Sequence, residues 1–147
     1  MLVWFFMEYI KTKYPNVKVK RSGHGGLGLF AEELIEKNRD IIEYVGEIIT
    51  AKEADESKGK YLFELNSKFT LDGKSRTNIA CYINHSCLPN AEADVIKMKI
   101  IISAKRTILS SEEITYDYGK EYFDEFIKPH GCKCGFCDGQ GKIRSKK

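Results

Sequence analysis

The chain has 147 residues, which is enough for one domain whose hydrophobic core needs no disulfide bonds. Hydrophobic residues make up 42% of the sequence and charged residues 31%, as in ordinary soluble globular proteins. The formal net charge of +3 is too small to indicate nucleic-acid binding, and basic residues gather only in the tail at 142–147, so no direct contact with nucleic acid is expected.

The first predicted element is a short N-terminal helix. Apolar side chains recur at helical spacing at Leu2, Phe5, Phe6, Tyr9 and Ile10. This segment is too short to cross a bilayer and lacks an export signal, so we expect no membrane insertion, an intracellular location and reduced cysteines. We expect residues 1–16 to form a helical extension that packs on the domain or on a partner chain, and self-association through residues 1–10 is one arrangement left open.

Short strands dominate the pattern after this extension. Alternating residues predict a strand at Val17–Arg21, and the glycine-rich loop 22–28 separates it from a strand at Leu29–Ala31. Residues 41–50 indicate one or two strands with a kink at Gly46.

A helix and a hairpin are expected next. Residues 51–58 are the best helix former in the front half, and Thr50 is a suitable N-cap. Residues 61–65 and 68–72 predict a hairpin whose turn lies at Asn66–Ser67.

The second half continues with short elements. We expect a helical turn within 77–85, strands at 94–96, 99–103 and 114–118, and a helical turn at 121–127. Many short strands with little helix indicate a mainly β fold.

Five cysteines are present, and three of them, Cys132, Cys134 and Cys137, lie among glycines near the end of the chain. Thiolates at this spacing can converge on one zinc ion, which requires a fourth ligand, either Cys87 or Cys81. A redox pair at Cys134 and Cys137 is disfavoured because no strand precedes it and no amphipathic helix follows. Three cysteines in a glycine-rich tail are also poor candidates for a hydrophobic core.

Two motifs resemble the SET-domain protein lysine methyltransferases, namely Asn84-His-Ser-Cys-Leu-Pro-Asn90 and Glu113-Ile-Thr-Tyr-Asp-Tyr-Gly119. Further segments match the family in the same order along the chain, at Gly26–Gly28, Glu43–Thr50, Tyr61–Leu65 and the late cysteines of a post-SET segment. The likeness covers about residues 17–137. The chain departs from the family at Cys81–Tyr82, where a basic residue and Phe are usual.

The resemblance implies a fold of the β-clip type, in which several small sheets surround a pseudoknot-like crossing of residues 84–87 and 116–119. A SET domain would occupy residues 17–127, and a post-SET zinc segment with a basic tail would occupy 128–147. In this family the fourth zinc ligand corresponds to Cys87, which gives a structural site of Cys87, Cys132, Cys134 and Cys137.

The resemblance also implies transfer of a methyl group from S-adenosyl-L-methionine to a protein lysine. The catalytic positions correspond to Tyr118, Tyr61 and Tyr116. The residues expected to contact the cofactor are Gly26, Leu27, Gly28, Tyr61, Asn84, His85, Tyr118, Phe123, Cys134 and Gly135. The remaining histidines, His24 and His130, are interpreted as ordinary surface or core residues without a role in the site.

The expected substrate is a histone or another basic chromosomal protein that receives one or two methyl groups. A nuclear, chromatin-associated location follows for a eukaryotic source and a cytoplasmic one otherwise. Two alternatives stay open at this point: a binding module with the same fold and weak turnover, and a methyltransferase for a non-chromatin protein such as a ribosomal protein.

Overall fold

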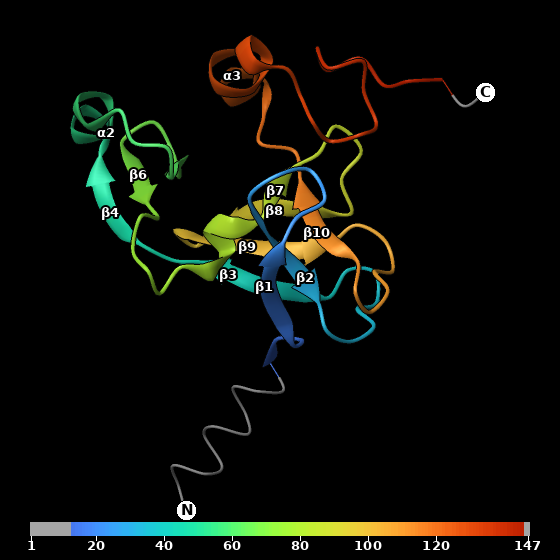
Figure 1. Ribbon diagram of the computed structural model, residues 1–147. Helices are drawn as coiled ribbons and strands as arrows, with labels where there is room; N and C mark the ends of the chain where they lie inside the picture. The colour runs from blue at the N-terminus through green and yellow to red at the C-terminus, as the bar shows by residue number, and fades with distance from the viewer. Residues whose placement is uncertain (1–12, 146–147) are drawn as a thin grey trace, which may run out of the picture.

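The computed structural model describes residues 13–145 and shows three small sheets with short helical segments at one end (Figure 1). The helix predicted around Leu2–Ile10, and any association through it, lies outside these residues. Within 13–145, none of the helices has the length and apolar character needed to cross a membrane.

The first sheet has the strand order β1-β2-β10-β7. Its members are β1 (Val17–Arg21), β2 (Leu27–Ala31), β10 (Glu113–Tyr116) and β7 (Asn84–His85). β10 pairs antiparallel with β2 and parallel with β7, so that Thr115 lies opposite Asn84 and Tyr116 opposite His85. The two motifs, about 30 residues apart in the chain, are thus neighbours in space.

The second sheet supplies much of the core and has the order β3-β9-β8. Its strands are β3 (Asp40–Tyr44), β8 (Ala91–Ile96) and β9 (Lys99–Ala104). In β9 the side chains of Ile100 and Ile102 are fully buried and alternate with more exposed neighbours, as expected for a strand packed on one face.

The third sheet, with order β4-β6-β5, contains the predicted hairpin. It comprises β4 (Glu47–Thr50), β5 (Leu62–Glu64) and β6 (Phe69–Asp72), and α2 (Ala51–Ser57) follows β4 directly. Thr50 accepts a hydrogen bond from the backbone of Glu53, whose carboxylate accepts one from the Thr50 backbone. This capping box fixes the start of α2, as predicted.

Gly46 allows the chain to leave the second sheet and enter the third. A Cβ at this position would lie 2.0 Å from the carbonyl oxygen of Asp72, so only glycine permits the close approach. The buried side chain of Asn78 joins the same region, accepting a hydrogen bond from the Val45 backbone and donating one to the Gly73 carbonyl.

Helical turns complete the described chain. A 3₁₀ turn covers Ile79–Tyr82, and α3 (Lys120–Tyr122) continues into a π-helical stretch at Phe123–Ile127 and a 3₁₀ turn at Lys128–His130. The loop after this segment carries the late cysteines. The mainly β fold with small sheets and a C-terminal cysteine cluster is therefore confirmed.

Candidate functional site

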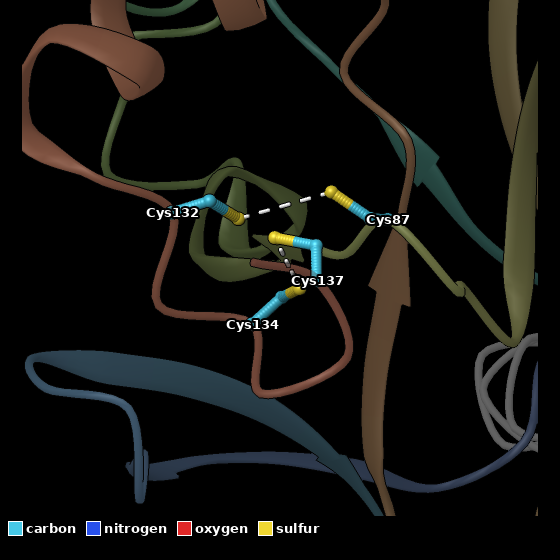
Figure 2. A group of neighbouring side chains, drawn as sticks. All are labelled: Cys87, Cys132, Cys134 and Cys137. Atoms are coloured by element: carbon cyan, nitrogen blue, oxygen red, sulfur yellow. Dashed lines mark hydrogen bonds between the residues drawn. The ribbon is translucent and has the colours of Figure 1, made fainter. Parts of the chain in front are cut away.

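Four cysteine side chains converge in one place (Figure 2). Cys87 follows β7, whereas Cys132, Cys134 and Cys137 come from the loop after the last 3₁₀ turn. Their Sγ atoms all lie within 4.8 Å of one another, with 3.9 Å between Cys87 and Cys132 and 3.7 Å between Cys134 and Cys137. Tetrahedral zinc with Zn–S bonds of about 2.3 Å separates its sulfurs by ~3.8 Å, so the cluster fits this ion. Cys81 packs against the hydrophobic core instead.

The cysteine loop is shaped by hydrogen bonds to sulfur and by a backbone bond across it. The backbone N–H of Phe136 donates to Cys134 Sγ and that of Gly139 to Cys137 Sγ, each at 3.4 Å. The Cys132 N–H donates to the Gly139 carbonyl at 2.8 Å, which closes the loop. These donors favour thiolates, the form that binds metal ions.

The thiols differ in how readily they ionise. Burial raises the pKa of Cys87 far above its ordinary value and that of Cys132 to about 11. Burial also opposes ionisation of Cys134, but backbone N–H groups of Cys87 and Phe136 outweigh it and lower the pKa of this thiol to about 7. A coordinated cation would deprotonate the remaining thiols.

His85 lies between the cysteine cluster and Tyr118. Its Nδ1 accepts a hydrogen bond from the Tyr118 backbone N–H at 3.1 Å, and its Nε2 lies 3.3 Å from Cys87 Sγ. The ring packs on Tyr118 and Phe123 at centroid distances of 5.4 and 5.2 Å. Burial lowers the pKa of His85, although the Asp117 carboxylate opposes this in part.

One cavity opens beside the cluster and is here called the cysteine-side cavity. Its volume is about 440 Å³, within the range of roughly 300–1,000 Å³ found for small-molecule sites. Among its lining residues are Asn84, His85, Tyr118, Cys134, Phe126 and Phe136. The cavity therefore combines polar groups from the two motifs with two aromatic rings.

A polar network fixes Asn84 at the cysteine-side cavity. Its amide nitrogen donates to the carboxylate of Glu113 at 2.7 Å and to the carbonyl of Leu27 at 2.9 Å. The hydroxyl of Ser22 donates to the other oxygen of Glu113 at 2.9 Å. A Cβ on Gly28 would lie 2.2 Å from the Glu113 carboxylate, so a larger residue there would displace this carboxylate from Asn84. The amide oxygen of Asn84 is left to accept a hydrogen bond from a ligand.

A second cavity of about 540 Å³ is here called the tyrosine cavity. All three tyrosines predicted to be catalytic, Tyr61, Tyr116 and Tyr118, line it. Tyr118 and Phe126 line both cavities, so the two spaces meet at these rings.

The tyrosine hydroxyls have different partners. The Tyr118 hydroxyl donates to the carbonyl of Ile83, which leaves its oxygen lone pairs for another group. The Tyr44 hydroxyl donates to the Tyr61 carbonyl at 3.0 Å. Tyr116 is 7% exposed, and its hydroxyl has no hydrogen-bond partner among the described residues. Burial raises the pKa of both Tyr116 and Tyr118, so both phenols are neutral.

The rim of the tyrosine cavity is mainly acidic. Its charged lining residues are Asp55, Glu64, Glu121, Glu125, Lys60 and Lys120. The ammonium group of Lys120 lies 2.7 Å from Asp124, which balances part of the positive charge. The cavity thus suits a ligand whose positive charges lie at the acidic rim, outside the aromatic interior of the cavity.

Several residues expected at the cofactor site lie beside the cysteine-side cavity without lining it. Gly28 and Leu27 contact Asn84. Gly135 lies near His24, because a Cβ built on Gly135 would be 3.3 Å from the Cε1 atom of His24. Phe123 is buried against the His85 ring. Tyr61 lines the tyrosine cavity but not the cysteine-side cavity, and Gly26 lines neither.

Sequence reasoning did not single out several lining residues. Tyr44, Phe63 and Tyr122 line the tyrosine cavity, Phe136 and Arg106 line the cysteine-side cavity, and Phe126 lines both. The signal available for the aromatic members was composition alone, with eight Tyr and eight Phe in the chain. Because these residues come from separate elements, no motif predicts their convergence.

Comparison with known proteins adds an independent finding. The model of the SET domain family matches residues 26–119. A Schizosaccharomyces pombe protein named histone-lysine N-methyltransferase, H3 lysine-4 specific, is 43% identical over 122 residues, covering 74% of this chain and 13% of that protein. The Drosophila melanogaster histone-lysine N-methyltransferase trr is 39% identical over 143 residues, covering 87% of this chain and 6% of that protein.

A human relative has a similar level of identity and also covers most of this chain. Histone-lysine N-methyltransferase 2D of Homo sapiens is 39% identical over 139 residues, covering 86% of this chain and 2% of that protein. The chain therefore spans only a small part of the length of these relatives.

Proposed function

The chain belongs to the SET-domain family, and from this membership we propose that it is a protein-lysine N-methyltransferase that uses S-adenosyl-L-methionine. The observation that carries the proposal is the meeting of two cavities at Tyr118, one beside the cysteine cluster and one lined by tyrosines. The cofactor would occupy the first cavity and supply a methyl group on a sulfonium, and the substrate lysine would enter the second.

The tyrosine cavity favours the reactive form of lysine. A free lysine has a pKa near 10.4, so only about one amine in a thousand is neutral at about pH 7.4, a cost of roughly 4 kcal/mol. An aromatic cavity disfavours the ammonium by desolvation. The Tyr118 hydroxyl donates its proton in a hydrogen bond to the Ile83 carbonyl, so the phenol oxygen can accept a hydrogen bond from the N–H of the substrate amine. This hydrogen bond would orient the lone pair of the amine nitrogen.

We propose roles for the remaining site residues on the same basis. Tyr61 and Tyr116 would hold the lysine side chain, and the free amide oxygen of Asn84 would bind the cofactor's amino group. Gly26, Leu27, Gly28, His85, Phe123 and Gly135 would shape the cofactor site mainly through their backbone and packing. One structural zinc ion per chain would be held by the cluster of Cys87, Cys132, Cys134 and Cys137.

A basic protein segment is the proposed substrate, because four carboxylates stand at the rim of the tyrosine cavity. The names of the relatives make a histone the first choice, with lysine 4 of histone H3 the first position to test. A nuclear, chromatin-associated location follows from that substrate. Incubating the protein with labelled cofactor and either core histones or ribosomal proteins tests this choice. Preferential labelling of ribosomal proteins would overturn the choice of substrate, and no labelling of either set would overturn the activity.

Asn84→Ala is expected to weaken cofactor binding. The substitution removes the amide oxygen and also leaves the Glu113 carboxylate without its 2.7 Å partner. Hydrogen bonds to charged groups contribute roughly 1.5–3 kcal/mol, which corresponds to about a 10- to 100-fold higher Kd. Calorimetric titration with S-adenosylmethionine measures this, and the exposed Asn16→Ala is the matched control. An unchanged Kd in the Asn84 variant would contradict the assignment.

Tyr116→Phe is expected to raise the number of methyl groups added. The hydroxyl of Tyr116 can hold a water molecule beside the amine, in the space that a further methyl group would need. Removing the hydroxyl frees this space and costs one hydrogen bond, about 1 kcal/mol. We expect mono- or dimethyllysine from the unmodified protein and a higher state from the variant, measured by product mass over time. The control is Tyr82→Phe, outside both cavities, and processive trimethylation by the unmodified protein would contradict this prediction.

A further inference from the structure

The side chain of His85 makes two contacts that cross the boundary between the cysteine cluster and the site of methyl transfer. On one side it accepts the backbone N–H of Tyr118 at 3.1 Å, and on the other it lies 3.3 Å from the sulfur of Cys87. The side chain is 6% exposed and is held between the rings of Tyr118 and Phe123. Its orientation is therefore fixed by packing as well as by hydrogen bonds.

The identity of these partners assigns the position of the ring proton. A backbone N–H can only donate, so Nδ1 of His85 must present a lone pair to Tyr118. In a neutral imidazole the proton is then on Nε2, which faces Cys87 Sγ. A metal-bound thiolate can accept a hydrogen bond from Nε2–H. An unprotonated Nε2 would instead place its lone pair against the sulfur lone pairs, which repel it.

We propose that His85 is a positioning residue that connects the metal cluster to Tyr118 through two hydrogen bonds. In the first, His85 Nε2–H donates to Cys87 Sγ, and in the second, the Tyr118 backbone N–H donates to His85 Nδ1. This inference rests on the proposed function for the role of Tyr118. It goes beyond that function in making the metal site a support for the catalytic tyrosine. Both ring nitrogens have protein partners, so the cofactor would contact His85 through its backbone.

The connection has a direct consequence for the metal. Groups that hydrogen-bond to metal ligands typically change metal affinity or activity about 10- to 100-fold when they are removed. Loss of the Nε2 donor should therefore loosen the metal, and loss of the Nδ1 acceptor should loosen the backbone at Tyr118. These two effects belong to different atoms of one side chain and can be separated.

Two substitutions separate them. The side-chain oxygen of Asn in His85→Asn stands near the position of Nδ1, so this variant keeps an acceptor for Tyr118 and loses the donor to Cys87. The longer amide of His85→Gln reaches toward the sulfur, so this variant keeps a donor to Cys87 and loses the acceptor. Transfer of zinc to a chromophoric chelator is expected to be about 10- to 100-fold faster in His85→Asn and near the unmodified rate in His85→Gln.

The second readout concerns Tyr118. In His85→Gln the ¹H–¹⁵N resonance of the Tyr118 amide should move, and kcat should fall by a larger factor than KM for the cofactor rises. In His85→Asn the Tyr118 amide resonance should change less. Equal zinc-release rates in both variants, or an unchanged Tyr118 amide in His85→Gln, would overturn the proposal.

The unmodified, zinc-loaded protein provides a test that does not depend on how the variants fold. The ¹⁵N spectrum of the imidazoles should show the ring proton of His85 on Nε2 and none on Nδ1. A proton on Nδ1 of His85 would overturn the proposal. The spectrum and the zinc-release rates need no turnover, so an inactive protein would contradict the proposed function and leave this inference intact.

Discussion

Tyr118→Phe is expected to lower kcat by about 10²–10³-fold, the usual effect of removing one positioned hydrogen-bonding group from a transition state. Only the hydroxyl is lost, and the ring still packs on His85 and at 4.9 Å from Tyr116. The Ile83 carbonyl loses its donor, and because Ile83 is buried this loss should cost roughly 1–3 kcal/mol of stability. Thermal unfolding should therefore show a folded protein with a moderately lower Tm.

The comparison that identifies the catalytic hydroxyl is with Tyr122→Phe. Tyr122 packs edge-on against Tyr118 at a centroid distance of 5.0 Å and also lines the tyrosine cavity. Its hydroxyl is 3.4 Å from the Lys60 carbonyl, at the long end of a hydrogen bond, so its removal should have much less effect on kcat. Near-normal turnover in Tyr118→Phe, or a larger loss in Tyr122→Phe, would mean that the wrong tyrosine has been assigned.

Removal of zinc is expected to have the largest effect on structure. Within Lys128–Ser145 the only buried residues are Cys134 and Cys137, so this segment has almost no hydrophobic core of its own. Structural zinc contributes roughly 10–16 kcal/mol in zinc-finger peptides. A chelator should therefore greatly increase amide hydrogen exchange after Lys128 while β9 stays protected.

Zinc removal should also weaken cofactor binding, because Cys132, Cys134 and Phe136 line the cysteine-side cavity. If two contacts of about 1.4 kcal/mol each are lost, the Kd rises on the order of 100-fold. Metal analysis should find one zinc ion per chain, and Cys87→Ser should lower that content. Cys81→Ser is the matched control and should retain the metal. Well under one zinc per chain, or metal loss in Cys81→Ser alone, would contradict the assignment.

The elements that could be predicted from sequence are those whose cause is local. The alternation at Val17–Arg21, the cap at Thr50 and the turn at Asn66–Ser67 each depend on neighbouring residues, and the structure confirms all three. The start of β2 could not be placed, because Leu27 pairs with Arg21 of β1 and this pairing extends the strand into the glycine-rich loop.

The helical segment after β10 shows a second limit. Its sequence predicts a simple turn at 121–127, whereas the structure has α3 followed by a π-helical stretch and a 3₁₀ turn. The change in helical register accompanies the packing of Tyr122 against Tyr118 and of Phe123 against His85. These partners come from distant segments, so a local pattern contains no information about them.

The site divides in the same way. The structure brings together at one cavity the three tyrosines that the resemblance assigns to catalysis, Tyr61, Tyr116 and Tyr118, and their catalytic roles stay predictions. Phe123 was expected to contact the cofactor, a role that stays a prediction, while Phe126 and Phe136 line the cysteine-side cavity. Which aromatic side chain faces a cavity depends on the register of a helical segment, and no sequence motif sets it.

The most direct test of the proposed lysine methyltransferase activity is mass spectrometry of histone H3 after incubation with the zinc-loaded protein and S-adenosylmethionine. We expect the added mass of one or two methyl groups on the Nζ atom of a specific lysine, with at least a hundredfold slower appearance for Tyr118→Phe. Methylation at a residue other than lysine, or no added methyl group on histone H3, would contradict this activity.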